Sequence, residues 1–262
     1  MNNITSIQNP LIKEIHSLHQ KKNRNELGLF LIEGYKSVFE AIKSGLNIEN
    51  IFISENFDKD ISKYNSEKIF RVSEQVMKKI STTESAPEIV AVAKQLKFSI
   101  NDIFTSKNPV IILLENIKDP GNLGTIVRTA VASNVSGIIL TDESVDVYNP
   151  KTVRSSAANL WKIPIVTMTD KANIKNTINN FKKCDFIATV VNKDAKLYYN
   201  IDFTKPTVIM FGSEAEGLSE ILTKQADIFA TIPMNDKVES INLSISVGVM
   251  LYESIRQRKF SN

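Results

Sequence analysis

Apolar positions in the first third of the chain recur at alternating helical and strand spacings. Four of them follow a helical period directly after a proline that suits a first helical turn: Leu11, Ile12, Ile15 and Leu18. The run GLFLIEG then indicates a short buried strand, YKSVFEAIKSG a helix stopped by Gly45, and IENIFIS another strand. The same alternation continues through EKIFRVS, SEQVMKKIS and PEIVAVAKQL. We therefore expect residues 1–98 to form a small α/β domain, followed by a polar linker.

From residue 109 onward, the apolar positions gather into near-continuous runs of Val, Ile and Leu. These runs are PVIILLEN, SGIILTD, WKIPIVTM, CDFIATVV, PTVIMFG and ADIFATIP. Uninterrupted runs are typical of strands that are buried on both faces, as in a parallel sheet with helices on either side. Residues 107–262 are therefore predicted to form an α/β domain with a mostly parallel open sheet and helices on both faces.

The composition narrows the range of functions. The 262 residues contain one cysteine, Cys184, and two histidines, His16 and His19, which are too few for an ordinary zinc site, so no metal is expected. No apolar stretch approaches the length of a membrane helix, and the N-terminus lacks a secretory signal, so we expect a cytoplasmic protein that does not act at a membrane. The net charge of +3 suits a polyanionic partner but is too small to identify one.

The densest basic cluster is Lys21, Lys22 and Arg24, near the expected end of the first helix. These side chains are candidates for phosphate contacts with a nucleic acid. Cations at the end of a helix also complement its dipole, without any ligand being involved. The sequence leaves these two interpretations of the cluster open.

Three loops of the second domain stand at the carboxyl ends of expected strands, where ligands bind in open parallel sheets. The first loop, DPGNLGTIVRTA, follows the run PVIILLEN. Its Pro-Gly pair predicts a turn, Asn122 a helix N-cap, and Asn134 a left-handed residue at the end of that helix. Turn and cap chemistry explain these residues without a ligand, but they do not explain Arg128, which stands in an otherwise small and apolar helix. Arg128 is therefore a candidate for function.

The second loop, FGSEAEGLS, has glycines that let the backbone approach a ligand, but it lacks the patterns of phosphate-binding and dinucleotide-binding loops. Glu214 and Glu216 would repel phosphates and tolerate a cationic ligand, although acidic residues also suit a helix start. In the third loop, IPMNDKVESINLSISVGVMLYE, either Ser240 or Asn242 is expected to cap a long C-terminal helix. The small residues in the first turns of that helix permit close approach of another element.

Taken together, the three loops resemble the motifs of the SpoU-type (TrmH-like) family of the SPOUT superfamily, which are RNA ribose 2'-O-methyltransferases. The resemblance is carried by NIKDPGNLGTIVRTA, IMFGSEAEGLS and IPMNDKVESINLSISVGVMLYE, and it covers nearly the whole chain. It implies a SPOUT domain with a deep C-terminal trefoil knot, although true knots are nearly absent from proteins. The opening FLIEGYKSVFEAI is similar to the family's N-terminal RNA-binding module, which resembles ribosomal proteins.

The resemblance also implies a cofactor and a set of site residues. S-adenosylmethionine would bind between the second and third loops, and matching the motifs places Gly212, Ile232 and Ile241 there. Arg128 aligns with the arginine that the family is thought to use to activate the ribose hydroxyl. Because a guanidinium stays protonated, we expect Arg128 to bind the phosphate and lower the pKa of the hydroxyl rather than take its proton. The polar residues expected to order this site are Asn122, Glu214, Ser240 and Asn242.

The segment NPKTVRSSAANLWKIPI resembles a further family segment, and Arg154 within it is another candidate for RNA binding. Ala158 stands where the family has a glycine, so a positive φ there would be strained. Three other departures are Val131 in place of a frequent acidic residue, and Asn134 and Glu88 in place of glycines. These departures concern the fit to the substrate more than the reaction.

The resemblance implies a structured RNA as substrate. Ribosomal RNA is favoured over transfer RNA, because a ribosomal-protein-like module accompanies the former in relatives. The family works as a homodimer, and the apolar face of the last helix fits either a subunit contact or the core of the chain itself. Two alternatives are an RNA-binding relative without transfer activity and a nucleotide-binding α/β enzyme. Retention of the polar site residues argues against the first, and the absence of phosphate-loop patterns argues against the second.

Overall fold

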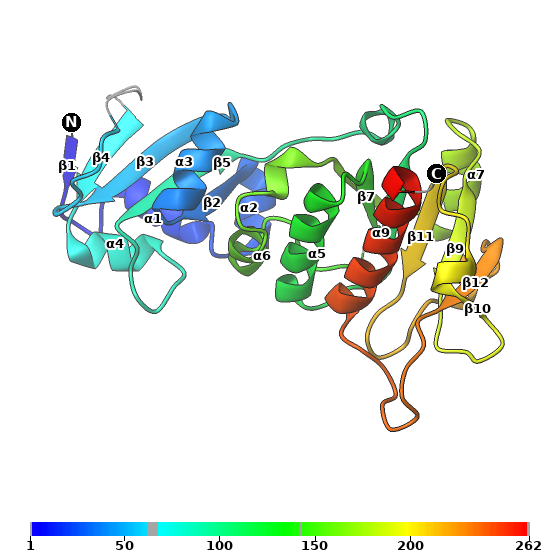
Figure 1. Ribbon diagram of the computed structural model, residues 1–262. Coiled ribbons are helices and arrows are strands. Elements are labelled where there is room, and N and C mark those ends of the chain that lie inside the picture. The colour runs from blue at the N-terminus through cyan, green and yellow to red at the C-terminus, as the bar shows by residue number, and fades with distance from the viewer. Residues whose placement is uncertain (1, 62–67, 142, 261–262) are drawn as a thin grey trace. The chain divides into compact units, whose positions relative to one another are not determined.

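The computed structural model describes residues 2–61, 68–141 and 143–260. Contacts divide the chain into two compact units, each with its own sheet (Figure 1). The first unit is Met1–Leu96 with Asp146–Trp161, and the second is Lys97–Val145 with Lys162–Asn262. The segment Asp146–Trp161 thus packs with the N-terminal part of the chain, although the sequence placed it inside the predicted domain 107–262.

The first unit is built on a mixed sheet in the order β1-β4-β3-β5-β2. Its strands are β1 (Asn2–Ile4), β2 (Leu29–Glu33), β3 (Ile48–Ser54), β4 (Ile69–Val72) and β5 (Ile89–Lys94). Strands β1, β4 and β3 run parallel, whereas β5 is antiparallel to both of its neighbours, β3 and β2. The helices and strands that the apolar pattern predicts over residues 10–97 are confirmed, and β1 is an element that the pattern did not predict.

The helices of the first unit are α1 (Pro10–Ser17), α2 (Lys21–Leu27), α3 (Tyr35–Lys43), α4 (Glu74–Ile80) and α6 (Pro150–Ser155). Helix α1 begins at Pro10 because the side-chain oxygen of Asn9 accepts the backbone N–H of Leu11 at 2.9 Å. Helices α1 and α4 bury one apolar face each in a shared core with Leu31 and Phe52 of the sheet. Helix α3 packs on β2 and β5. Helix α2 was not predicted.

Tyr148 fastens the segment Asp146–Trp161 within the first unit. Its hydroxyl accepts the backbone N–H of Leu96 at 2.8 Å and donates to the Leu96 carbonyl at 3.0 Å. Its ring lies 4.7 Å from that of Phe30, measured between centroids. Burial raises the pKa of Tyr148 to about 12, so the hydroxyl stays neutral and keeps both hydrogen bonds at physiological pH.

The second unit contains a seven-stranded sheet in the order β10-β12-β9-β11-β6-β7-β8, in which every neighbouring pair is parallel. Its strands are β6 (Val110–Leu114), β7 (Gly137–Thr141), β8 (Ile165–Met168), β9 (Asp185–Thr189), β10 (Lys196–Leu197), β11 (Thr207–Phe211) and β12 (Ile228–Thr231). Strands β6, β7 and β11 are buried at every position, which confirms the interpretation of the apolar runs.

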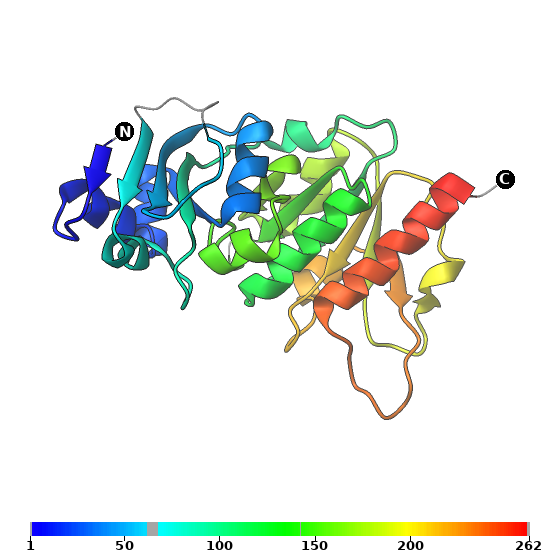
Figure 2. The ribbon, with the colours of Figure 1, turned by 60° about the vertical axis from the view of Figure 1, so that its left-hand side comes forward.

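Helices cover both faces of this sheet. They are α5 (Pro120–Ala132), α7 (Ile174–Asn179), α8 (Glu220–Thr223) and α9 (Leu243–Phe260). Residues of α7 and α8 share a core with Leu113 and Val208 on one face. Helices α5 and α9 lie side by side on the sheet, as Figure 2 shows in a second view. The predicted α/β architecture is therefore confirmed, while the trefoil knot stays a prediction.

Candidate active site

The carboxyl ends of three neighbouring strands, β12, β9 and β11, open into a cavity of about 590 Å³. The second and third loops of the sequence analysis form most of its wall. Six of the candidate residues line it: Gly212, Glu214, Ile232, Ser240, Ile241 and Asn242. Residues that are far apart in the sequence thus surround one space, at the sheet edge where parallel strands bind ligands.

The loop after β11 folds back on itself, and this geometry explains its glycines. The backbone N–H of Gly217 donates to the Ser213 carbonyl at 3.0 Å, and Gly217 has a φ of +69°, which favours glycine. A Cβ on Gly212 would lie 1.9 Å from the carbonyl carbon of Gly217. Gly212 is therefore required by contact with the loop's own backbone, in addition to any approach to a ligand.

Glu115, which directly follows β6, anchors the end of this loop. The Glu115 carboxylate is buried and accepts the backbone N–H of Ser219 at 2.7 Å. Lys171 lies 3.4 Å from the same carboxylate and 3.2 Å from that of Glu143. Burial alone would lower the pKa of Lys171, but the two carboxylates outweigh it and raise this pKa. Lys171 therefore stays charged and balances the buried Glu115.

Asn122 connects the first loop to the other two. Its amide nitrogen donates to Glu214 at 2.5 Å, and its amide oxygen accepts from the Asn242 side chain at 3.1 Å. The prediction that Asn122 caps α5 is wrong, because Asp119 is the N-cap and accepts the backbone N–H of Asn122 at 2.9 Å. With Pro120 as the first residue of the helix, Asn122 is the third and lies in its first turn. Its side chain is therefore able to join the loops.

Asn242 both bonds Asn122 and caps the C-terminal helix. Its side-chain oxygen accepts the backbone N–H of Ser244 at 2.9 Å, directly before the first turn of α9. Of the two residues expected to cap this helix, Asn242 is thus the one that does. Ser240 lines the cavity and has no hydrogen bond within the part of the chain that the structure describes.

Arg128 lies on α5 and is exposed. Within the described ranges its guanidinium makes no hydrogen bond and no ion pair, and Arg128 does not line the cavity. The helix that carries it packs against α9, whose cap is Asn242. Arg128 is therefore an exposed cation on α5, the helix that also carries Asn122 and packs against α9.

The structure changes the interpretation of the basic cluster. Helix α1 ends at Ser17 and Lys21 is the first residue of α2, so Lys21 and Lys22 begin a helix, whereas Arg24 lies in the last turn of α2. Cations at a helix N-terminus oppose the dipole, which removes the explanation based on it for the two lysines. Lys21 and Lys22 are exposed and remain candidates for phosphate contacts.

Arg24 differs from these two lysines because it is buried, with 2% of its surface exposed. It donates twice to Asp146, at 2.6 and 2.9 Å. It also donates to the carbonyls of Leu18 and His19, at 2.7 and 2.9 Å. A side chain with these partners holds the first unit together and has no access to RNA. Arg24 is therefore withdrawn from the candidate RNA contacts.

Arg154 has an intermediate environment. Its guanidinium donates to the buried carboxylate of Glu33 at 2.6 Å and to the Thr82 hydroxyl, while about a third of the side chain stays exposed. Ala158, a few residues further on, has a φ of +64°, so this position, where the resemblance leads us to expect a glycine, is left-handed. Its exposed neighbour Ala157 has a φ of +48°.

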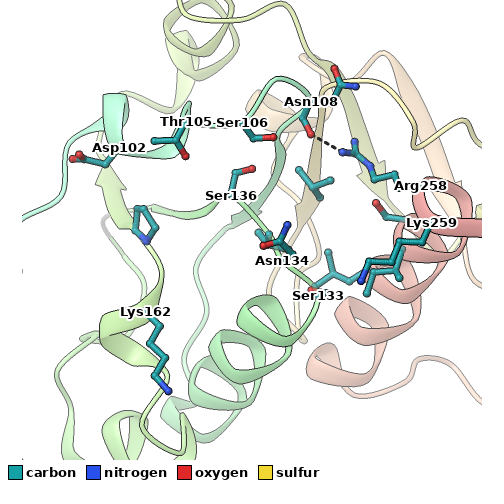
Figure 3. A pocket seen from close by; sticks show the side chains of 16 residues that line it. Asp102, Thr105, Ser106, Asn108, Ser133, Asn134, Ser136, Lys162, Arg258 and Lys259 are labelled. Atoms are coloured by element: carbon teal, nitrogen blue, oxygen red, sulfur yellow. Dashed lines mark hydrogen bonds between the residues drawn. The ribbon is translucent and has the colours of Figure 1, made fainter. Parts of the chain in front are cut away.

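A second cavity, of about 350 Å³, lies at the opposite edge of the same sheet, where β6, β7 and β8 begin (Figure 3). Arg258 crosses this region and donates to three backbone carbonyls: Asn108 at 2.5 Å, Lys205 at 2.6 Å and Phe203 at 2.7 Å. These bonds fasten the last turns of α9 to the start of the sheet. None of the candidate site residues lines this cavity.

Comparison with known proteins agrees with this arrangement. Residues 109–252, which contain the first two loops and all but the last residue of the third, match the SpoU rRNA Methylase family, and residues 9–91 match the MRM3-like substrate binding domain. A tRNA/rRNA methyltransferase of Synechocystis, described as uncharacterized, is 34% identical over 97% of this chain and 94% of its own length. The chain belongs to the SpoU rRNA methylase family.

The names of other relatives state a target or a cofactor. A Bacillus subtilis 23S rRNA (guanosine(2553)-2'-O)-methyltransferase is 27% identical over 96% of this chain and 98% of its own length. The crystal structure of an AdoMet-bound rRNA methyltransferase from Sinorhizobium meliloti is 31% identical, with a TM-score of 0.88 over 99% of both chains. The fold described here is thus similar to that of an rRNA methyltransferase crystallised with S-adenosylmethionine.

Sequence reasoning missed two residues that support the site of this SpoU methylase. Glu115 ends an apolar run and resembles an ordinary polar residue after a strand, and only the fold shows that Ser219 reaches it. Asp119 before Pro120 did carry a signal, because an Asp-Pro pair is typical of a helix start with the aspartate as cap.

The structure also bears on the two features that the composition argued against, a metal site and a membrane-spanning helix. Among the residues that the structure describes, no three or more His, Cys, Asp or Glu side chains gather where they could hold a metal ion. No helix in the described ranges is both long and apolar enough to cross a membrane.

Proposed function

We propose that this protein transfers the methyl group of S-adenosylmethionine to a ribose 2'-hydroxyl of large-subunit ribosomal RNA. The observation that carries the proposal is the Glu214–Asn122–Asn242 hydrogen-bond chain, in which Asn122 bonds both of the other side chains and so joins the three loops beside one cavity. Relatives of the same family that cover most of this chain are named as 23S rRNA 2'-O-methyltransferases. The N-terminal match to a substrate-binding domain supports an RNA substrate.

The cavity residues fit S-adenosylmethionine. A volume of about 590 Å³ is in the ordinary range for small-molecule sites. Phe211, Ile232 and Ile241 provide apolar wall, and Glu214 and Glu216 provide negative charge. When bound, this cofactor supplies a methyl carbon attached to a positively charged sulfur. The two carboxylates would attract that charge and disfavour phosphate-bearing nucleotides.

The remaining task of the site is to hold and activate the ribose. Asn122, Glu214 and Asn242 fix the loops on which an in-line approach of the hydroxyl oxygen depends, and such alignment is worth several powers of ten in rate. Arg128 would bind the neighbouring phosphate and lower the pKa of the 2'-hydroxyl, since its guanidinium stays protonated. Ser240, at the cavity wall, would orient the substrate.

Two further features belong to the proposal. Lys21, Lys22 and Arg154 would contact RNA phosphates from the first unit. The protein would act in the cytoplasm as a homodimer, with α9 in the subunit contact. Exposed apolar side chains on one face of α9 support that contact: Ile245 is 57% exposed and Tyr252 is 56% exposed.

The proposal is tested by incubating the purified chain with tritiated S-adenosylmethionine and either a 23S rRNA transcript or total tRNA. We expect label in the 23S transcript and, by primer extension at low nucleotide concentration, one new 2'-O-methyl stop. Label on tRNA alone, or on a base, would refute the proposed substrate or the proposed atom. RNA binding without any label would identify an inactive relative.

A further inference from the structure

Helix α3 of the first unit exposes an aromatic side chain that the fold does not need. Phe39 is 41% exposed, although phenylalanine is normally buried. Its ring stacks on that of Tyr35, one helical turn earlier, with 5.8 Å between centroids and 27° between planes. The buried face of α3 is formed by other residues, Val38 and Ala41. The Tyr35–Phe39 pair is therefore a surface feature of the helix.

A buried aromatic ring supports the Tyr35–Phe39 pair. Phe57 is buried and lies 6.3 Å from Tyr35, measured between ring centroids. Gly34, with a φ of +85°, starts α3 and lets the chain turn sharply from β2 into the helix. The aromatic pair therefore has a fixed support and loses little conformational entropy when a ligand stacks on it.

One lysine contacts the pair, and two more lie on the same helix. The Lys59 ammonium lies 4.5 Å from the centroid of the Tyr35 ring and is held there by Glu88 at 3.0 Å. Lys36 and Lys43 are exposed, and with Phe39 they occupy positions that share one face of a helix. An exposed aromatic ring that shares a helix face with cations is complementary to a nucleotide, which has a flat base and a negative phosphate.

We propose that Tyr35 and Phe39 form a stacking surface for an unpaired base of the RNA substrate, with Lys36, Lys43 and Lys59 contacting the adjacent phosphates. The inference rests on the proposed function, because it takes RNA as the substrate. Bases in a duplex are stacked on one another and offer no face to a side chain, so the surface selects a loop, a bulge or a single strand.

The test compares the full chain with Phe39→Ala in binding to a fluorescein-labelled oligouridylate, followed by anisotropy. We expect the dissociation constant to rise about 5-fold to 150-fold, the range for losing one stacked base. Binding to a blunt RNA duplex of the same length should stay unchanged. Phe181→Ala is the matched control, because Phe181 is 43% exposed in the second unit and also stacks on another ring, that of Phe104.

Phe39→Trp should restore oligouridylate binding, and its new indole fluorescence should be quenched on titration. The proposal is overturned if Phe39→Ala binds like Phe181→Ala, if duplex binding falls equally, or if the unsubstituted chain does not bind oligouridylate. Methyl transfer to 23S rRNA, measured in parallel, separates the two claims. Stacking without transfer would refute the proposed function alone, and transfer with normal binding by Phe39→Ala would refute the stacking surface alone.

Discussion

Arg24 and Arg128 are both RNA-contact candidates on sequence alone, yet the fold gives them opposite environments. Arg24 is 2% exposed and donates four hydrogen bonds, two of them to Asp146. Arg128 is exposed and has no such partner within the described residues. A buried guanidinium requires a full set of partners, because desolvation of an unpaired charge costs several kcal/mol. An exposed one needs none, and it stays available to a ligand.

The difference shows what decides the role of a cation in this chain. Asp146 lies 122 positions after Arg24, and only the packing of the segment Asp146–Trp161 in the first unit brings it there. Among the described residues, no carboxylate pairs with Arg128. The surroundings of the two side chains, and not their charge or helical setting, therefore separate a residue that stabilises the fold from one that can meet the substrate.

The same substitution at both positions tests this comparison most strongly. Arg24→Met should lower the free energy of unfolding by about 3–5 kcal/mol, because it removes the cation that is paired with the largely buried Asp146 carboxylate. Arg128→Met should change that free energy by less than about 0.5 kcal/mol, as is usual at exposed sites. Urea titration followed by circular dichroism measures both. Equal losses in the two variants would contradict the distinction.

For methyl transfer we expect a large direct effect of the Arg128 substitution, although this substitution hardly changes stability. Arg128→Met is expected to lower methyl transfer about 10²-fold to 10³-fold, the range for losing one charge-stabilising donor from a site. Its S-adenosylmethionine affinity should stay close to that of the unsubstituted protein, since Arg128 does not line the cavity. Single-turnover transfer and calorimetric titration of the cofactor separate the two effects. Unimpaired turnover would remove Arg128 from the reaction.

Much of the fold could be predicted because burial restricts composition. Strands β6, β7 and β11 are buried at every position, so their sequences are apolar throughout and can be recognised without a structure. The elements that the pattern missed have mainly polar sequences. Helix α2, for instance, has the sequence KKNRNEL, and its buried residue is Arg24, which no hydrophobic pattern identifies.

The candidate site was predictable to the extent that it depends on loop composition. The residues around the cavity come from loops whose glycines and small residues the family resemblance explains. The partners of those residues were not predictable. The bond from Asn122 to Glu214 spans 92 positions, and the one from Asn242 to Asn122 spans 120. Hydrogen bonds of this range are set by the order of the strands, which the local sequence does not state.

Lys21 and Lys22 allow exposed and buried cations of one helix, α2, to be compared. They are neighbours of Arg24 on α2 but exposed, so they should act on RNA and not on stability. Changing both to Gln is expected to reduce the slope of log affinity against log salt by about 2, which is about one unit for each phosphate that is no longer neutralised. The free energy of unfolding should hardly change. Filter binding to 23S rRNA at several salt concentrations gives the slope, and an unaltered slope would leave the two lysines without a role.

The smallest expected effect lies in the segment that brings Asp146 to Arg24. Ala157 and Ala158 have φ values of +48° and +64°, a conformation that costs an L-residue about 1–2 kcal/mol relative to glycine. Ala157→Gly relieves this strain at an exposed position and, after the added entropy of the unfolded glycine, should raise the free energy of unfolding by about 0.5–1 kcal/mol. Ala158→Gly should gain less, because it also removes a buried methyl group worth about 0.8 kcal/mol. Thermal unfolding of both variants measures these changes in stability. An equal gain in both would mean that burial of the Ala158 methyl group contributes nothing. A loss of stability in Ala157→Gly would mean that the backbone at Ala157 is not strained.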